Sequence, residues 1–124
     1  MKRAAFGLLL ALAGVSALAQ ARHQPPAYEV PGGDARRGRE LMGDFGCGNC
    51  HAIPGIRGAR GNVGPPLTRI GDRVFVAGVL RNTPENLMRW LQHPQQVVPG
   101  NGMPEMGITE PQARDIASYL YTLR

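Results

Sequence analysis

The chain has 124 residues, among them 17 glycines, 11 prolines and two cysteines, and its formal net charge is +5. This length allows one small domain with a thin hydrophobic core. Such a domain often needs additional stabilisation, for example by a disulfide or a bound metal. The basic balance does not indicate a nucleic-acid-binding protein, because the arginines are not interleaved with aromatic residues. An acidic protein partner or an anionic membrane surface suits this charge better.

Residues 1–19 have the pattern of a secretory signal peptide. A basic start precedes an apolar run over residues 4–18, and Ala17-Leu18-Ala19 fits the small-x-small rule for cleavage. Cleavage two residues later fits nearly as well, so we place the site near Ala19. The apolar run is shorter than the roughly 20 residues that span a bilayer, so we expect no stable membrane anchor. The mature chain is therefore expected in the periplasm.

Residues 20–32 predict a flexible leader, because the stretch that ends at Gly33 is rich in proline and lacks apolar periodicity. The folded domain is expected over residues 33–124. Its first helix is expected to begin after Asp34 as the N-cap and to end at Gly46. Its buried side is a stripe at helical spacing, made of Gly38, Leu41, Met42 and Phe45.

Two more helices are expected further along the chain. Thr83 is a cap and Pro84 the first position of a helix that ends at His93-Pro94, and Thr109 opens the last helix with a capping box. Residues 52–73 and 94–108 are expected to be loops, and residues 74–80 a short extended piece. The buried positions are Leu87, Met88, Trp90 and Leu91 on the second helix and Ala113, Ile116, Ala117 and Leu120 on the last.

These patterns predict an all-α fold of three main helices joined by Gly/Pro-rich loops. So few residues enclose a continuous core only with difficulty, unless a large apolar ligand fills the space between the helices. The architecture therefore predicts a bound cofactor.

Cys47-Gly48-Asn49-Cys50-His51 is the C-x-x-C-H pattern of covalent haem c attachment. Two thiols at this spacing add to the two vinyl groups of one haem, and the adjacent imidazole is then held beneath the iron. A local disulfide, a redox C-x-x-C and a zinc site are the alternatives. A redox motif needs a strand–helix alternation that is missing here, and zinc needs four well-spaced ligands. We predict one covalent haem c.

An electron-transferring haem needs a second axial ligand opposite His51. The sequence offers four candidates. His23 lies in the leader, and His93 stands before a helix-ending proline, where a surface or capping role is expected. The methionines of the loop over residues 94–108 remain, Met103 and Met106.

From about Gly33 to Leu123 the chain resembles a class I cytochrome c, with the order helix, C-x-x-C-H, Gly/Pro loop, helix, methionine loop and C-terminal helix. Residues 87–94, followed by Val98-Pro99-Gly100-Asn101-Gly102-Met103, resemble the family's helix and P-G-x-x-M loop. Residues 61–90 are similar to the cytochrome c domain fused to subunit II of haem-copper oxidases. The resemblance implies a cytochrome c fold wrapped around one covalent haem.

The resemblance also implies roles for individual residues. It places the distal ligand at Met103, with Met106 as the alternative, and it makes the carbonyl of Pro65 the acceptor for the His51 imidazole. Further haem contacts follow by the same resemblance. Arg73 and Asn101 match propionate-binding positions, and Trp90 occupies a distal-side position.

The function expected from this set is periplasmic electron transfer with His51 and Met103 as axial ligands and no catalytic residues. The expected partners are redox proteins, namely a terminal oxidase, a cytochrome complex or a dehydrogenase. A permanently bound cytochrome subunit of one such complex is the first alternative. A haem enzyme or gas sensor is the second, and it needs an open position on the iron.

Overall fold

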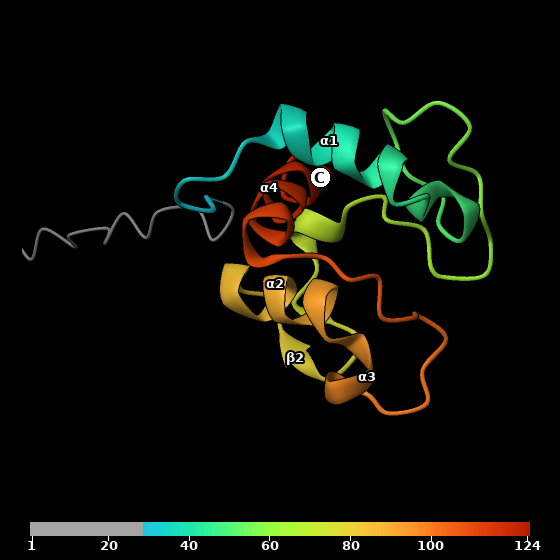
Figure 1. Cartoon of the computed structure of the whole chain (residues 1–124), viewed down its shortest axis with the longest axis vertical. Helices are drawn as coiled ribbons and strands as arrows, with labels where there is room; N and C mark the ends of the chain where they lie inside the picture. Colours follow the sequence, from blue (N-terminus) through green and yellow to red (C-terminus); the bar gives the residue numbers. More distant parts are fainter. Residues whose placement is uncertain (1–28) are drawn as a thin grey trace, which may run out of the picture.

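The computed structural model of the chain describes residues 29–124 as a mainly helical fold (Figure 1). The predicted signal peptide, residues 1–19, and the predicted leader before Glu29 lie outside the described residues. In chain order the elements are α1 (Ala35–Asp44), the 3₁₀ helices η1 (Cys47–Asn49) and η2 (Ile70–Asp72), β1 (Phe75–Val76), β2 (Leu80–Arg81), α2 (Pro84–Gln92), α3 (Pro94–Val97) and α4 (Glu110–Leu120).

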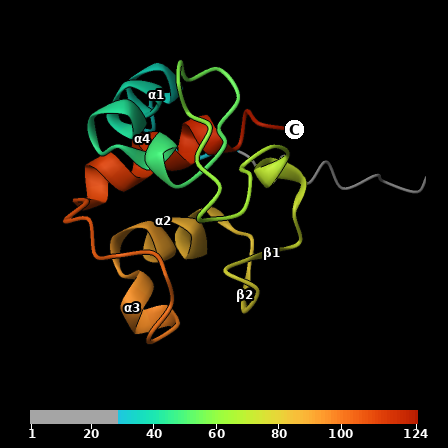
Figure 2. The same cartoon turned by 90° about the vertical axis from the view of Figure 1, so that its right-hand side faces the viewer.

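Helices α1 and α4 lie across one another and form the most extensive helix contact of the fold (Figures 1 and 2). Gly38 permits this approach, because a Cβ there would lie 1.9 Å from the carbonyl oxygen of Asp115. The predicted cap of α1 is present, since the Asp34 carboxylate accepts a hydrogen bond from the N–H of Arg37 at 3.0 Å. This bond holds the pKa of the Asp34 carboxyl below its usual value. Helix α1 therefore packs directly on α4, with Gly38 at the contact.

Helix α2 begins where the sequence predicts, with Thr83 Oγ1 accepting a hydrogen bond from the N–H of Asn86 at 3.3 Å. The extended piece expected over residues 74–80 is a small hairpin, in which β1 and β2 pair antiparallel. Ala77 and Gly78 at its tip have φ values of 53° and 72°. Two successive left-handed residues make the tight turn that suits a two-strand ribbon.

Helix α3 corrects the expectation that all of residues 94–108 form a loop. The carbonyl of His93 accepts hydrogen bonds from the N–H groups of Gln96 and Val97, both at 3.1 Å, which closes one helical turn. The sequence argument treated Pro94 only as a helix stop. A proline also suits the first turn of a new helix, because its missing N–H has no partner to lose there.

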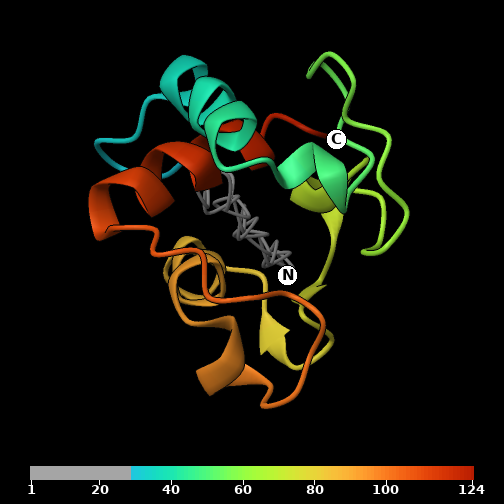
Figure 3. The same cartoon turned by 45° about the vertical axis from the view of Figure 1, so that its right-hand side comes forward.

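The core lies between α1, α2 and α4, with Met42, Leu87 and Ile116 among its most deeply buried side chains. Val30, which the sequence analysis placed in the leader, is also buried, so the packed chain begins before Gly33. Figure 3 shows α1 and α4 on one side of the molecule and α2 with α3 on the other. Within residues 29–124 no helix has the length and apolar character needed to cross a membrane.

Candidate functional site

The C-x-x-C-H motif lies on one tight turn directly after α1. Gly46 has a φ of 69°, a left-handed conformation that takes the chain out of the helix. Residues 47–49 then form η1, and the N–H groups of Cys50 and His51 both donate to the carbonyl of Cys47, at 3.2 and 3.0 Å. The two thiols and the imidazole are therefore carried by a single turn of backbone.

Both cysteines of the motif are half-buried, and no disulfide joins them. Burial raises the pKa of the Cys47 thiol, and the neighbouring Cys50 raises it further. The Cys47 side chain packs against the apolar core. Cys47 therefore lies at the boundary between the core and the surface.

The loop that follows the motif folds back on it at glycines. The N–H of Gly61 donates to the carbonyl of Gly48 at 3.0 Å, and that of Gly64 donates to the carbonyl of Cys50 at 2.8 Å. A Cβ at Gly61 would lie 2.4 Å from the carbonyl carbon of Cys50, and one at Gly48 would lie 2.7 Å from the Cβ of Ala59. The sequence analysis predicted a Gly-rich loop here, but it did not single out these positions.

The His51 imidazole is held by the same loop. Its Nδ1 lies 2.7 Å from the carbonyl oxygen of Pro65, which confirms the predicted contact. A carbonyl only accepts hydrogen bonds, so Nδ1 carries the proton and Nε2 is left with a free lone pair. Gly64 lies against the ring, where a Cβ would be 2.3 Å from Cε1. The loop thus fixes both the tautomer and the position of the ring.

Arg73 reaches the segment next to Pro65. Its guanidinium Nη2 donates to the carbonyl of Pro66 and lies 3.4 Å from the carbonyl oxygen of Thr68. Arg73 therefore braces the loop that orients His51. A contact of this guanidinium with a haem propionate stays a prediction.

The P-G-x-x-M loop is closed by its own asparagine. Asn101 Oδ1 accepts a hydrogen bond from the N–H of Met103 at 2.6 Å, and its Nδ2 donates to the carbonyls of Pro94 and Val98 at 2.9 and 2.7 Å. The Asn101 amide is thus engaged within the loop, and its contact with a propionate also stays a prediction. Met103 and Met106 are both half-buried and pack against the core.

The two histidine alternatives lie elsewhere. His93 caps the C-terminus of α2 and the N-terminus of α3, as expected for a capping residue, and its Nδ1 lies 4.0 Å from a carboxylate oxygen of Glu105. His23 lies outside the described residues. Among the described residues, His51 is therefore the histidine that lies next to the two cysteines of the motif.

The geometry agrees with a comparison of the sequence against known families. The family model described as cytochrome c matches residues 35–124, which is most of the chain. The chain belongs to the cytochrome c family. This membership confirms the resemblance that the C-x-x-C-H motif and the methionine loop indicated.

Curated proteins of similar sequence are about a third identical to this chain over the aligned residues. Cytochrome c2 of Rhodopila globiformis is 34% identical over 108 residues, which cover 77% of this chain and 98% of that protein. Cytochrome c oxidase subunit 2 of Alkalihalophilus pseudofirmus is 35% identical over 91 residues, and that of Bacillus subtilis is 37% identical over 71 residues. These matches cover 73% and 56% of this chain. The chain spans only 26% and 20% of the two oxidase subunits.

As a cytochrome c, the chain carries a covalent haem c, and Cys47 and Cys50 stand at the spacing that attaches one. The surrounding residues fit this group, because Gly64 places no side chain over the imidazole and His51 keeps Nε2 free. Half-buried apolar side chains from several elements also pack against the core around the site, and an apolar macrocycle has matching chemistry. They are Leu67, Leu80, Met88, Trp90, Met103 and Met106.

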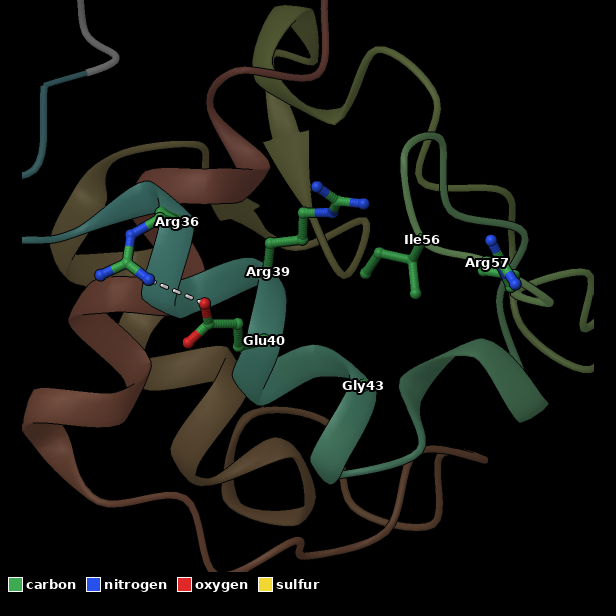
Figure 4. Close-up of a pocket in the computed structure, with 6 residues that line it drawn as sticks. All are labelled: Arg36, Arg39, Glu40, Gly43, Ile56 and Arg57. Carbon is green, nitrogen blue, oxygen red and sulfur yellow. Dashed lines mark hydrogen bonds and ion pairs between the residues drawn. The ribbon is translucent and has the colours of Figure 1, made fainter.

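A cytochrome c domain over residues 35–124 implies electron transfer. A basic pocket lies on its surface between α1 and the loop after the motif (Figure 4). Arg39 and Arg57 flank Ile56 there, and neither guanidinium has an ion-pair partner among residues 29–124. We name this feature the arginine pocket; its volume is about 250 Å³ and it is lined by Arg36, Arg39, Glu40, Gly43, Ile56 and Arg57.

Proposed function

We propose that the chain is an exported electron carrier, with His51 and Met103 as the axial ligands of its haem c, and that it moves single electrons between redox proteins of the periplasm. One observation carries this proposal: the fold holds the His51 ring through a hydrogen bond at Nδ1, and it holds the Met103 backbone through hydrogen bonds to its N–H and its carbonyl. When bound, haem c supplies one-electron chemistry, because its iron alternates between the ferric and ferrous states. We assign no catalytic residue.

His51 is supported as the proximal ligand by the loop that confines it. The Pro65 carbonyl, 2.7 Å from Nδ1, keeps the proton on that nitrogen and leaves the Nε2 lone pair available for iron. The same hydrogen bond would strengthen electron donation from the ring to the iron, and a stronger donor stabilises the ferric state. Arg73 keeps this loop in place through its bond to Pro66.

Met103 is supported as the distal ligand by the bonds on both sides of its backbone. Its N–H donates to Asn101 Oδ1 at 2.6 Å, and its carbonyl accepts from Gln95 Nε2 at 2.7 Å. In the described part of the chain, Met106 has no comparable backbone hydrogen bond. A ligand needs a fixed position to remain bound through each redox cycle, so we favour Met103. Its soft thioether stabilises ferrous iron and raises the potential relative to a second histidine.

Two protein ligands leave no open position on the iron, which favours a carrier over a haem enzyme or a gas sensor. We propose that Trp90 on α2 contributes apolar packing on the distal side. Arg73 and Asn101 are proposed to lie near the propionates. The Arg73 guanidinium suits a carboxylate, whereas both N–H donors of Asn101 are bonded to the Pro94 and Val98 carbonyls, so Asn101 would have to exchange one of these bonds for the propionate. Each of these side chains already braces or packs against the fold, so each would meet the group with little loss of conformational entropy.

The proposed location follows from the signal pattern of residues 1–19 together with the family. Partners are proposed to be a terminal oxidase, a cytochrome complex or a dehydrogenase. A second candidate is a tightly bound subunit of one such complex, and the similarity to cytochrome c oxidase subunit 2 favours it. Fractionation separates the two, because a free carrier is released with the periplasm and a subunit stays with membranes.

Two methionine variants test the ligand assignment. In the ferric holoprotein, Met103→Ala should abolish the far-red sulfur-to-iron absorption band and allow carbon monoxide to bind after reduction. Met106→Leu should keep the band, and it serves as the matched control. Loss of the band in Met106→Leu with retention in Met103→Ala would transfer the role to Met106.

A further inference from the structure

We infer that Gln95, on α3, is the positioning residue that anchors the loop carrying Met103. Its amide Nε2 donates to the carbonyls of Asn101 and Met103, at 2.9 and 2.7 Å, and its Oε1 accepts from the N–H of Gly100 at 3.0 Å. One side chain thus makes three hydrogen bonds to the backbone of three residues within the stretch 100–103. The inference rests on the proposed function in taking Met103 as an axial ligand.

The loop backbone needs an external partner at this place. Gly100 has a φ of 76°, and residues 98–108 form no helix or strand that could pair their N–H and C=O groups. The carbonyls of Asn101 and Met103 converge on one point, where two acceptors without a donor would repel each other. A primary amide meets this need, because it offers two donors and an acceptor in one plane.

A second contact fastens the loop beyond Met103. The backbone N–H of Gln95 donates to Glu105 Oε1 at 3.2 Å, and the other carboxylate oxygen of Glu105 lies 4.0 Å from Nδ1 of His93. Helix α3 therefore holds the chain on both sides of the methionine, through the Gln95 side chain before it and through Glu105 after it. This gives the short helix, which the sequence analysis missed, a role in the site.

The roles of Gln95 and Asn101 are separable. Asn101 links the loop to the carbonyls of Pro94 and Val98 and to the N–H of Met103, so it sets the internal shape of the turn. Asn101 also reaches α3 through Pro94, and Gln95 adds three further hydrogen bonds between α3 and the turn. Replacing Gln95 should therefore leave the turn formed but less firmly attached, and Met103 should be displaced more easily from the iron.

The test compares ferric holoprotein of the wild type with Gln95→Leu, Gln95→Glu and Gln96→Leu. Loss of the bond to Gly100 in Gln95→Leu should speed hydrogen exchange of the Gly100 amide about tenfold and tighten imidazole binding to the iron by a similar factor. The Met103 amide, which bonds to Asn101, should stay protected. Gln96→Leu is the control, because that side chain is exposed and makes no hydrogen bond among the described residues.

Gln95→Glu distinguishes the acceptor role of the amide oxygen from the donor role of the amide nitrogen. A carboxylate still accepts from Gly100 but no longer donates to Asn101 and Met103, so Gly100 exchange should stay slow while imidazole binding tightens. This variant also decides the matter if Gln95→Leu fails to fold. Wild-type exchange and wild-type imidazole affinity in Gln95→Leu would overturn the inference. Unchanged imidazole affinity in Met103→Ala would instead refute the ligand assignment, and Gly100 exchange would still test Gln95.

Discussion

Gly64 lies against the imidazole of His51 so closely that a Cβ at position 64 would be 2.3 Å from Cε1 and 2.7 Å from Nδ1. The same Nδ1 donates to the carbonyl of Pro65, one residue further along the chain. Gly64 cannot withdraw, because its own N–H donates to the carbonyl of Cys50 at 2.8 Å. The loop therefore confines the ring by contact at one residue and by a hydrogen bond at the next.

Gly64→Ala should displace the His51 ring from Pro65. We expect a lower yield of covalent holoprotein and a free energy of unfolding reduced by about 1–3 kcal/mol, the usual cost of overpacking. Denaturant unfolding of the purified holoprotein measures the stability. Val63→Ala is the control, since that side chain is 74% exposed and its loss should matter by less than about 0.5 kcal/mol. Equal stability of the two variants would contradict the confinement of the ring.

Gly38→Ala tests the crossing of α1 and α4. The added Cβ would lie 1.9 Å from the carbonyl oxygen of Asp115, so the helices must separate, and we expect a loss of about 3 kcal/mol or more. Gly43→Ala on the same helix has no atom within 4 Å of the new Cβ and should stabilise the protein by about 0.5–1 kcal/mol through helix propensity. Thermal unfolding of both variants should give shifts of opposite sign, and shifts of the same sign would rule out this account.

The helices were predictable because their signals are local. Asp34, Thr83 and Thr109 each stand one residue before a helix, and apolar residues at helical spacing mark the buried faces. The contact between His51 and Pro65 was also predictable, but only through the family resemblance. No short-range pattern in the sequence brings these two residues together.

The features that escaped prediction depend on contacts between distant segments. Helix α3 was hidden because Pro94 ends one helix and begins the next. The need for glycine at positions 48, 61 and 64 arises from chain segments that meet only in the folded protein. In the sequence Gln95 is an ordinary polar residue. Its role could not be predicted, because the hydrogen bonds from its amide to the 100–103 backbone form only in the folded protein.

The buried hydroxyl of Tyr121 leads us to expect that the free energy of unfolding falls at alkaline pH. Burial raises the pKa of its hydroxyl to about 12, and the carboxylate of Glu85 contributes to the rise. The hydroxyl donates to Asn82 Oδ1 at 2.9 Å, and Asn82 Nδ2 is engaged with the Ile70 and Arg73 carbonyls. Loss of the hydroxyl proton would therefore set a phenolate against the Asn82 amide oxygen.

Because the folded pKa of Tyr121 lies above the ordinary value of 10.0, the folded state holds this proton more tightly than the unfolded state. Its contribution is therefore complete below about pH 10 and is lost as the pH rises towards 12. The free energy of unfolding, measured with denaturant across this range, should fall. Tyr121→Phe should flatten the decline, at a cost of about 1 kcal/mol at neutral pH for the lost hydrogen bond. An equally steep decline in Tyr121→Phe would assign the effect to other groups.

The arginine pocket predicts how the carrier meets an acidic redox partner. Arg39 and Arg57 have no ion-pair partner within residues 29–124, whereas Arg36 is paired with Glu40 at 2.9 Å. Unpaired surface charges mainly accelerate the encounter, and salt screens them over about 8 Å at physiological ionic strength. The second-order rate of electron transfer with an acidic partner should therefore fall as salt is added.

Reversing both charges, with Arg39→Glu and Arg57→Glu together, should lower that rate about tenfold at low ionic strength and flatten its dependence on salt. The control reverses Arg81 and Arg89, two exposed arginines outside the pocket, and so changes the net charge by the same amount. If the pocket steers docking, stopped-flow rates will distinguish the two double variants. Equal slopes would mean that only net charge matters, and a wild-type rate indifferent to salt would mean that the partner docks on an apolar surface instead.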